Sequence, residues 1–206
     1  MKKTIYIVRH GEIDNPKSIA YGSNIEMQLS DKGRMQVQNL GLQILKSEVI
    51  PSIIYSSTLD RGIESASILA KTLGIARIEK DPNLKDSFIP ALAGKPITLF
   101  DELYSKGQDG YGIEFVKQGN ESREGIINRM FSAYKKAISN GEECVVLVSH
   151  GDPIRLLLYK LENPDSTIIP GMDILSKVDY LPKGHAWKLA LNEQGNLLSK
   201  ELISPN

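Results

Sequence analysis

The sequence is poor in the features that mark secreted, membrane-spanning and nucleic-acid-binding proteins. It has one cysteine, Cys144, so no intrachain disulfide can form, which fits a reducing compartment. No apolar run approaches the length of a membrane span, and the N-terminal apolar stretch stops at Arg9, too short for the core of a signal peptide. Lys plus Arg and Asp plus Glu both total 25, and the basic residues are scattered. We therefore expect a soluble, cytoplasmic protein that binds neither nucleic acid nor a membrane.

Length and composition favour one globular domain over residues 1–206. The chain is 41% apolar and 24% charged, close to ordinary globular usage. Apolar runs without alternation predict strands buried on both faces at residues 4–8, 53–55 and 144–148. Helical spacing predicts helices from Ser30, from Thr58 or Asp60 to Gly74, over about 123–139, and from near Pro153.

Strands that alternate with helices predict an α/β fold, a three-layer αβα sandwich with a mainly parallel central sheet. The tail differs, because residues 185–191 and 197–203 flank a polar turn and indicate a closing hairpin. Residues 83–122 are the least regular part and are rich in proline and glycine. We interpret them as an insertion that forms a lid above the sheet, not as a second domain.

Two strand-end histidines carry the strongest chemical signal. Arg9-His10-Gly11 directly follows the first predicted strand, and Ser149-His150-Gly151 directly follows the strand at 144–148. In an open parallel sheet, ligands bind beyond the carboxyl ends of the strands. One such histidine is usually a structural hydrogen-bonder, but two His-Gly pairs in equivalent places indicate a shared site.

Arg61 points to an anion at the same edge of the sheet. It lies just after the second predicted strand, in the first turn of the following helix. A cation is disfavoured there by the helix dipole unless an anion lies beside it. The alternative for Arg61 alone is a solvated side chain.

Several ordered blocks together resemble the histidine phosphatase superfamily, also called the phosphoglycerate mutase-like family. They are Arg9-His10-Gly11-Glu12, Tyr21-Gly22 followed by Leu29-Ser30-Asp31-Lys32-Gly33, the segment from Ser57 to Ala66, and Ser149-His150-Gly151. The resemblance implies that His10 is a nucleophile that accepts a phosphoryl group. It also implies that Arg9, Arg61 and His150 bind phosphate oxygens, without a metal or another cofactor.

The chain departs from the family pattern at two positions. The family's proton donor is usually a glutamate two residues after a leucine, and here Asp86 follows Leu84 by two residues. Asp86 is therefore the predicted acid, one methylene shorter, and Glu12, Asp101 and Glu102 are the alternatives. The family's asparagine, six residues past the histidine, is replaced by proline, so Asn15 carries that phosphate-binding role one residue early.

The expected activity is hydrolysis of a phosphomonoester, a small phosphorylated metabolite, through a phosphohistidine intermediate with His10 and His150 in catalysis. A phosphoglycerate mutase-type isomerase is the first alternative, although a mutase usually needs a larger and more basic lid. A non-catalytic phosphate-binding module is the second. The oligomeric state stays open, with a homodimer as one option. We expect His185 to pack, Cys144 to be buried and inert, and Tyr104 and Tyr111 either to line the pocket or to pack within the insertion.

Overall fold

The computed structural model describes residues 3–206, and its centre is one six-stranded sheet in the order β3-β2-β4-β1-β5-β6. The first four strands in this order are parallel, and β5 and β6 run antiparallel to them. This is the mainly parallel sheet with a closing hairpin that the sequence predicts. The strands are β1 (Lys3–Arg9), β2 (Ile53–Ser56), β3 (Arg77–Lys80), β4 (Cys144–Ser149), β5 (Ala186–Leu191) and β6 (Leu197–Ile203).

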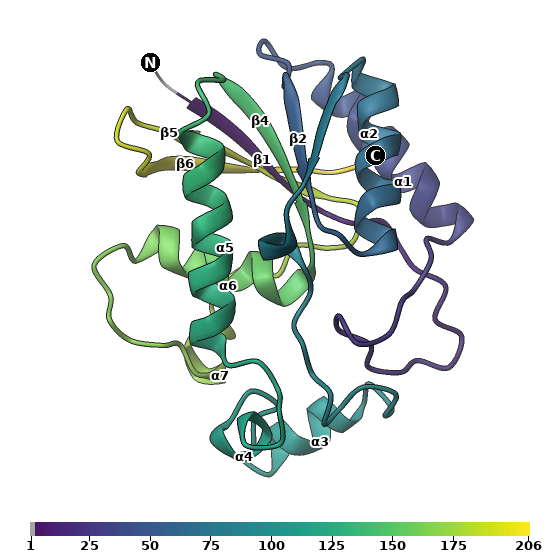
Figure 1. The fold of residues 1–206 in the computed structure, drawn as a ribbon, viewed down its shortest axis with the longest axis vertical. Helices are drawn as coiled ribbons and strands as arrows, with labels where there is room; N and C mark the ends of the chain where they lie inside the picture. The colour runs from purple at the N-terminus through teal and green to yellow at the C-terminus, as the bar shows by residue number, and fades with distance from the viewer. Residues whose placement is uncertain (1–2) are drawn as a thin grey trace.

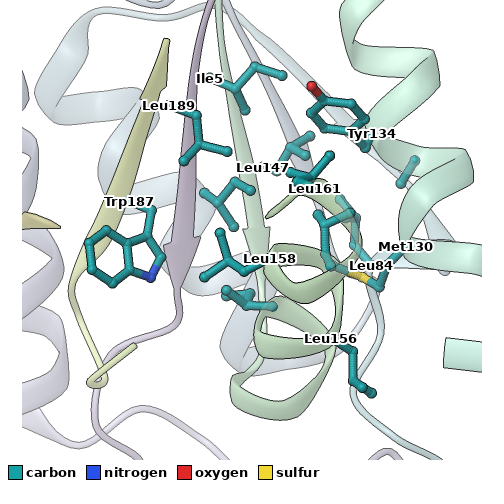
Figure 2. Packing of buried hydrophobic residues seen from close by; sticks show 14 of the residues in the cluster. Ile5, Leu84, Met130, Tyr134, Leu147, Leu156, Leu158, Leu161, Trp187 and Leu189 are labelled. Atoms are coloured by element: carbon teal, nitrogen blue, oxygen red, sulfur yellow. The ribbon is translucent and has the colours of Figure 1, made fainter. Parts of the chain in front are cut away.

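Helices cover both faces of the sheet, so the fold is the expected α/β sandwich (Figure 1). On one face α1 (Asp31–Ile44) and α2 (Asp60–Leu73) bury Val37, Leu40 and Leu69 against β1, β2 and β4. On the other face α5 (Arg123–Ile138) and α6 (Gly151–Glu162) form the larger core cluster. Figure 2 shows that cluster, in which Met130 and Leu158 pack close to strand side chains such as Leu147.

The helix ends follow the capping residues that the sequence supplies. Ser30 caps α1 through a hydrogen bond from the Gly33 N–H to its hydroxyl, and Gly74 ends α2 in the left-handed conformation. Helix α2 begins at Asp60, and α6 begins at Gly151, two residues before the proline that predicts it. The sequence analysis misses β3 because this edge strand is mostly exposed and lacks an apolar run.

The segment between β3 and α5 lies beyond the carboxyl ends of the parallel strands (Figure 1). It contains the short 3₁₀ helix η1 (Pro82–Leu84), α3 (Leu99–Ser105) and α4 (Ile113–Val116), and it is more helical than its sequence indicates. A small apolar cluster around Ile89, Leu92 and Leu103 holds it together. A further short helix, α7 (Met172–Leu175), precedes β5. In the described part of the chain, no helix has the length and apolar character that a membrane crossing requires.

Candidate active site

The parallel pairing of β1 and β4 brings the two strand-end histidines together. Arg9 lies opposite Ser149 in the register, and the His10 N–H donates to the Ser149 carbonyl at 3.2 Å. The imidazole rings of His10 and His150 are 5.1 Å apart between centroids, and both side chains are buried. The two histidines, which the sequence places at the ends of separate strands, therefore lie next to each other in the fold.

A backbone contact fixes the loop that carries His10. A Cβ atom added to Gly11 would lie 2.3 Å from the Gly33 carbonyl oxygen, and one added to Gly33 would lie 2.0 Å from the Glu12 carbonyl oxygen. Only glycine allows the loop after β1 and the first turn of α1 to approach this closely. The two segments therefore hold the orientation of His10 through main-chain contact.

His10 has the protonation state that a nucleophile needs. Its Nδ1 lies 2.7 Å from the Gly11 carbonyl oxygen, which can only accept, so Nδ1 carries the proton and Nε2 keeps its lone pair. Burial lowers the pKa of His10 well below 6.5, and the neighbouring His150, Arg61 and Arg9 lower it further. The ring is therefore neutral at physiological pH, with Nε2 available for attack.

Around His10, buried donors lack partners within residues 3–206. Arg61 is fully buried and donates through Nη2 to the Gly22 carbonyl at 2.7 Å, but its Nε and Nη1 have no hydrogen-bond partner. Arg9 donates through Nη1 to the Leu181 carbonyl at 2.9 Å, and its Nε has no partner either. Buried guanidinium N–H groups without acceptors are costly, and an anion in the site satisfies them.

His150 adds a donor to the same anion site. Its Nε2 lies 2.8 Å from the Ser57 hydroxyl, which accepts from the Leu59 N–H and can donate its own proton to that nitrogen. Nδ1 then carries the ring proton, and within residues 3–206 this atom has no hydrogen-bond partner. Burial, followed by the nearby arginines, lowers the pKa of His150 well below 6.5.

Asp86 reaches the site in spite of its shorter side chain. Its Oδ2 accepts from Arg61 Nη2 at 2.9 Å and lies 3.7 Å from His150 Nδ1. Asp86 also lines a cavity together with Arg9. The predicted acid, both histidines and Arg61 therefore share one small volume.

Arg129 of α5 holds the loop that carries Asp86. Its guanidinium donates to the carbonyl groups of residues 83 and 85 at 2.8 and 2.6 Å and to that of Asp86 at 3.3 Å. It also donates to both carboxylate oxygens of Glu121 at 2.7 and 3.0 Å. Side-chain exposure is 16% for Arg129 and 20% for Glu121, so both groups are largely out of water. The backbone on either side of Asp86 is thus fixed from α5.

A cavity of about 300 Å³ lies between Arg9, Asp86 and further residues of the segment that joins β3 to α5. Asn15 lines it, but its side chain bonds the N–H and C=O groups of Ile19, which makes it a brace of its loop in this structure. Tyr111 lines the cavity too, whereas Tyr104 is exposed. Among the alternative acids, Glu12 pairs with Lys32 outside the cavity, and Asp101 and Glu102 are exposed. A separate cavity of about 820 Å³, lined by Thr4, Gln43 and β6 residues, holds none of the predicted site residues.

Sequence reasoning misses four polar residues of the site. Asp152 is half-buried and lines the cavity, accepts from the Tyr111 hydroxyl at 2.6 Å, and has a pKa raised by its loss of contact with water. Lys183 and Tyr180 also line the cavity. Burial and the nearby Arg9 lower the pKa of Lys183. The Tyr180 ring centre lies 4.8 Å from the guanidinium carbon of Arg9. Ser57, in contact with His150, is the fourth. Only Ser57 and Asp152 had a signal, since each lies next to a strand end.

The other sequence predictions for single residues have clear outcomes. Cys144 is buried in β4, and burial raises its thiol pKa to about 12, so it is inert as expected. His185 is half-buried and bonds the Lys183 carbonyl through Nδ1 at 3.0 Å, outside the cavity. Residues 3–206 contain no group of three or more His, Cys, Asp or Glu side chains that could hold a metal ion.

Comparison with known proteins places this geometry in a family. The model of the histidine phosphatase superfamily (branch 1) matches residues 5–180. A metal-independent phosphoserine phosphatase of Arabidopsis thaliana is 27% identical, with 79% of this chain and 70% of the relative covered. A 2,3-bisphosphoglycerate-dependent phosphoglycerate mutase of Clavibacter sepedonicus is 30% identical, with 84% and 81% covered. The solved structure of Bacillus stearothermophilus YhfR superposes with a TM-score of 0.78 at 21% identity, covering 95% of this chain and 94% of that one.

Proposed function

The chain belongs to the histidine phosphatase superfamily, and on this basis we propose that it is a metal-independent phosphomonoester hydrolase that works through a phosphohistidine on His10. The observation that carries the proposal is the set of buried N–H donors without partners, on Arg9, Arg61 and His150, around a neutral imidazole. A phosphate group placed there would satisfy these donors and would meet the His10 Nε2 lone pair. The substrate is a small phosphorylated metabolite.

In the first step, His10 Nε2 attacks the phosphorus atom and the bond from phosphorus to the ester oxygen breaks. The departing oxygen takes a proton from the Asp86 carboxyl group, so the product alcohol leaves neutral. Arg9, Arg61 and His150 stabilise the charge that spreads over the three phosphoryl oxygens.

In the second step, water attacks the phosphorus atom on the opposite side from His10. Asp86, now a carboxylate, accepts a proton from that water, and the bond from phosphorus to Nε2 breaks. Inorganic phosphate leaves, and the neutral imidazole and the protonated Asp86 are restored. The same residues thus serve both steps, with positive charge supplied by arginines.

A mutase is the second candidate, because several relatives are phosphoglycerate mutases by name. A mutase has to retain the sugar acid and return the phosphate to a different hydroxyl group. The lid, residues 83–122, offers little to hold such an acid. Lys95, Lys106 and Lys117 are exposed, and they line neither the 300 Å³ cavity nor the cavity of about 320 Å³ next to it. Incubation with 3-phosphoglycerate separates the two activities: we expect free phosphate, and an isomerised product with little free phosphate would support the mutase instead.

The decisive experiment is labelling of the protein by substrate phosphate. With a ³²P-phosphomonoester and a rapid quench, the wild-type chain should carry acid-labile, base-stable label and should release phosphate. His10→Ala should lose both, and the control His185→Ala should keep both. Full turnover by His10→Ala would refute the mechanism. Tight vanadate binding by a wild-type chain that turns over no phosphoester would favour a non-catalytic phosphate-binding module.

A further inference from the structure

A second cavity of about 320 Å³ adjoins the cavity that Arg9 and Asp86 line. The two share Tyr111, Asp152 and Tyr180 as a common wall, with Ile97 just before α3 and Phe100 in its first turn. The second cavity lies between α3 and the helices α6 and α7, and no predicted catalytic residue lines it. It is therefore close to the phosphate site yet separate from the catalytic groups.

The far side of the second cavity is apolar. Leu156 of α6 and Met172 and Leu175 of α7 line it, and none of the three lines the first cavity. Ile97 is 48% exposed at the entrance, although a large apolar side chain gains from burial. A ligand with an apolar body would cover Ile97 and contact Leu156 and Met172.

Four charged side chains line this cavity. Arg123 makes a bidentate ion pair with Asp109, and Asp152 accepts from Tyr111 and is close enough to Arg155 for their opposite charges to attract. Arg155 uses Nε for the Val178 carbonyl at 3.1 Å and lies with its guanidinium carbon 5.4 Å from the Tyr180 ring centre. Within residues 3–206, Arg155 has no ion pair. One guanidinium at an apolar cavity is suited to an acidic group.

From this arrangement we infer that the leaving group of the substrate occupies the second cavity and has an aromatic-sized apolar body with an acidic group at its far end. The inference rests on the proposed function, because the phosphate of the same molecule occupies the first cavity. The apolar body lies between α3 and α7, and the acidic end contacts Arg155. A three-carbon sugar acid has no apolar body to fill this volume, so the inferred substrate is larger than phosphoglycerate.

Binding of three non-hydrolysable phosphonates tests the inference by calorimetry on the full chain: propylphosphonate, 3-phenylpropylphosphonate and its para-carboxylate. The phenyl group should tighten binding about tenfold to a hundredfold, which corresponds to burial of one aromatic side chain. The para-carboxylate should tighten it several-fold more. Equal affinity for propylphosphonate and 3-phenylpropylphosphonate would overturn the inference, and so would the absence of binding by all three.

Two variants assign the gains to the cavity. Met172→Trp should fill it and bring the phenyl-to-propyl affinity ratio close to one, while the matched surface control Met35→Trp, on the exposed side of α1, should keep the wild-type ratio. Arg155→Gln should remove the gain from the carboxylate but keep the gain from the phenyl group. A phenyl gain that survives Met172→Trp would place the ring elsewhere and refute the inference.

Turnover of two esters separates this inference from the proposed function. Ethyl phosphate and 2-phenylethyl phosphate release alcohols of similar basicity, so their chemical steps are comparable. We expect a kcat/KM about tenfold to a hundredfold higher for the phenyl ester. Hydrolysis of both esters at equal kcat/KM would overturn only the inference about the leaving group. Selective phosphonate binding without hydrolysis of either ester would overturn only the proposed hydrolase.

Discussion

Replacing Arg129 by methionine tests whether the loop that carries Asp86 has to be held from α5. The substitution keeps most of the apolar length of the side chain and removes five hydrogen bonds, three to loop carbonyl groups and two to Glu121. We expect the Asp86 carboxyl to lose its fixed position relative to the leaving oxygen. Arg61 keeps its hydrogen bond to the Gly22 carbonyl, and the histidines keep their contacts with Gly11 and Ser57, so phosphate should still bind.

The magnitude has a catalytic and a structural part. A positioned general acid contributes about 10²–10⁴-fold, so a displaced Asp86 should lower kcat/KM for an alkyl phosphate at least about tenfold. p-Nitrophenolate leaves without a proton, so kcat/KM for p-nitrophenyl phosphate, which does not include the later attack of water, should fall by less than about threefold. Breaking a buried ion pair costs about 3–5 kcal/mol, and with 16% and 20% exposure of the partners we expect about 2–3 kcal/mol. The melting temperature should then fall by about 4–12 °C.

The assay compares kcat/KM for the two esters in wild type, Arg129→Met, Arg129→Lys and the control Arg77→Met. Arg77 is a half-exposed arginine on β3 that pairs with Glu142, far along the strand from the site. The lysine variant keeps the charge but not the planar fork, and its activity should be intermediate. An equal proportional loss on both esters in Arg129→Met would show that Arg129 supports only the fold, and the positioning argument would be wrong.

Three further predictions follow from the site. Asp86→Asn should cut kcat/KM for alkyl phosphates about a hundredfold or more and spare kcat/KM for p-nitrophenyl phosphate, and equal losses in kcat/KM would remove Asp86 as the acid. The pKa values of His10 and His150 are depressed in the fold, so below pH 6.5 the unfolded chain binds more protons than the folded chain. The free energy of unfolding is therefore at its full value above pH 6.5. It falls as the pH drops below 6.5, by up to about 1.4 kcal/mol per pH unit for each ring. Urea unfolding between pH 7 and 5.5 should show this slope, and an unchanged slope in the doubly substituted His→Asn chain would contradict it. Gly151→Ala should lower phosphate affinity, because a Cβ there would lie 2.2 Å from the Tyr180 hydroxyl; fluorescence-monitored vanadate binding at the wild-type level would count against this packing argument.

The sequence predicts the parts of this molecule in which local pattern and burial agree. The runs at β1, β2 and β4 are apolar because both of their faces are covered, and Ser30 and Gly74 mark helix ends through their own chemistry. The strand-end histidines follow from the same logic, since parallel strands end at one edge of the sheet. Edge strand β3 has no such signal, because its residues are mostly exposed.

The parts that sequence alone could not supply depend on contacts between distant segments. Arg129 lies about 45 residues from the loop that it holds, and nothing in the helical pattern of α5 distinguishes it from a solvated arginine. Lys183 and Tyr180 come from an irregular connection before β5, and only the fold brings them to the cavity. Asn15 was assigned by resemblance, and its bonds to Ile19 give it a local partner that its sequence position did not reveal.

The close approach of Gly11 and Gly33 has a consequence for how this scaffold can change over time. The orientation of the His10 side chain depends on a contact between two main-chain segments. A Cβ atom added at Gly11 or Gly33 would lie only 2.3 or 2.0 Å from a carbonyl oxygen of the other segment. Side chains of α3, α7 and the other segments that line the two cavities can therefore be exchanged without changing the orientation of His10 toward the phosphate site. New substrate specificities can arise by substitution of the residues that line the cavities, whereas a mutation at either glycine alone should abolish the activity.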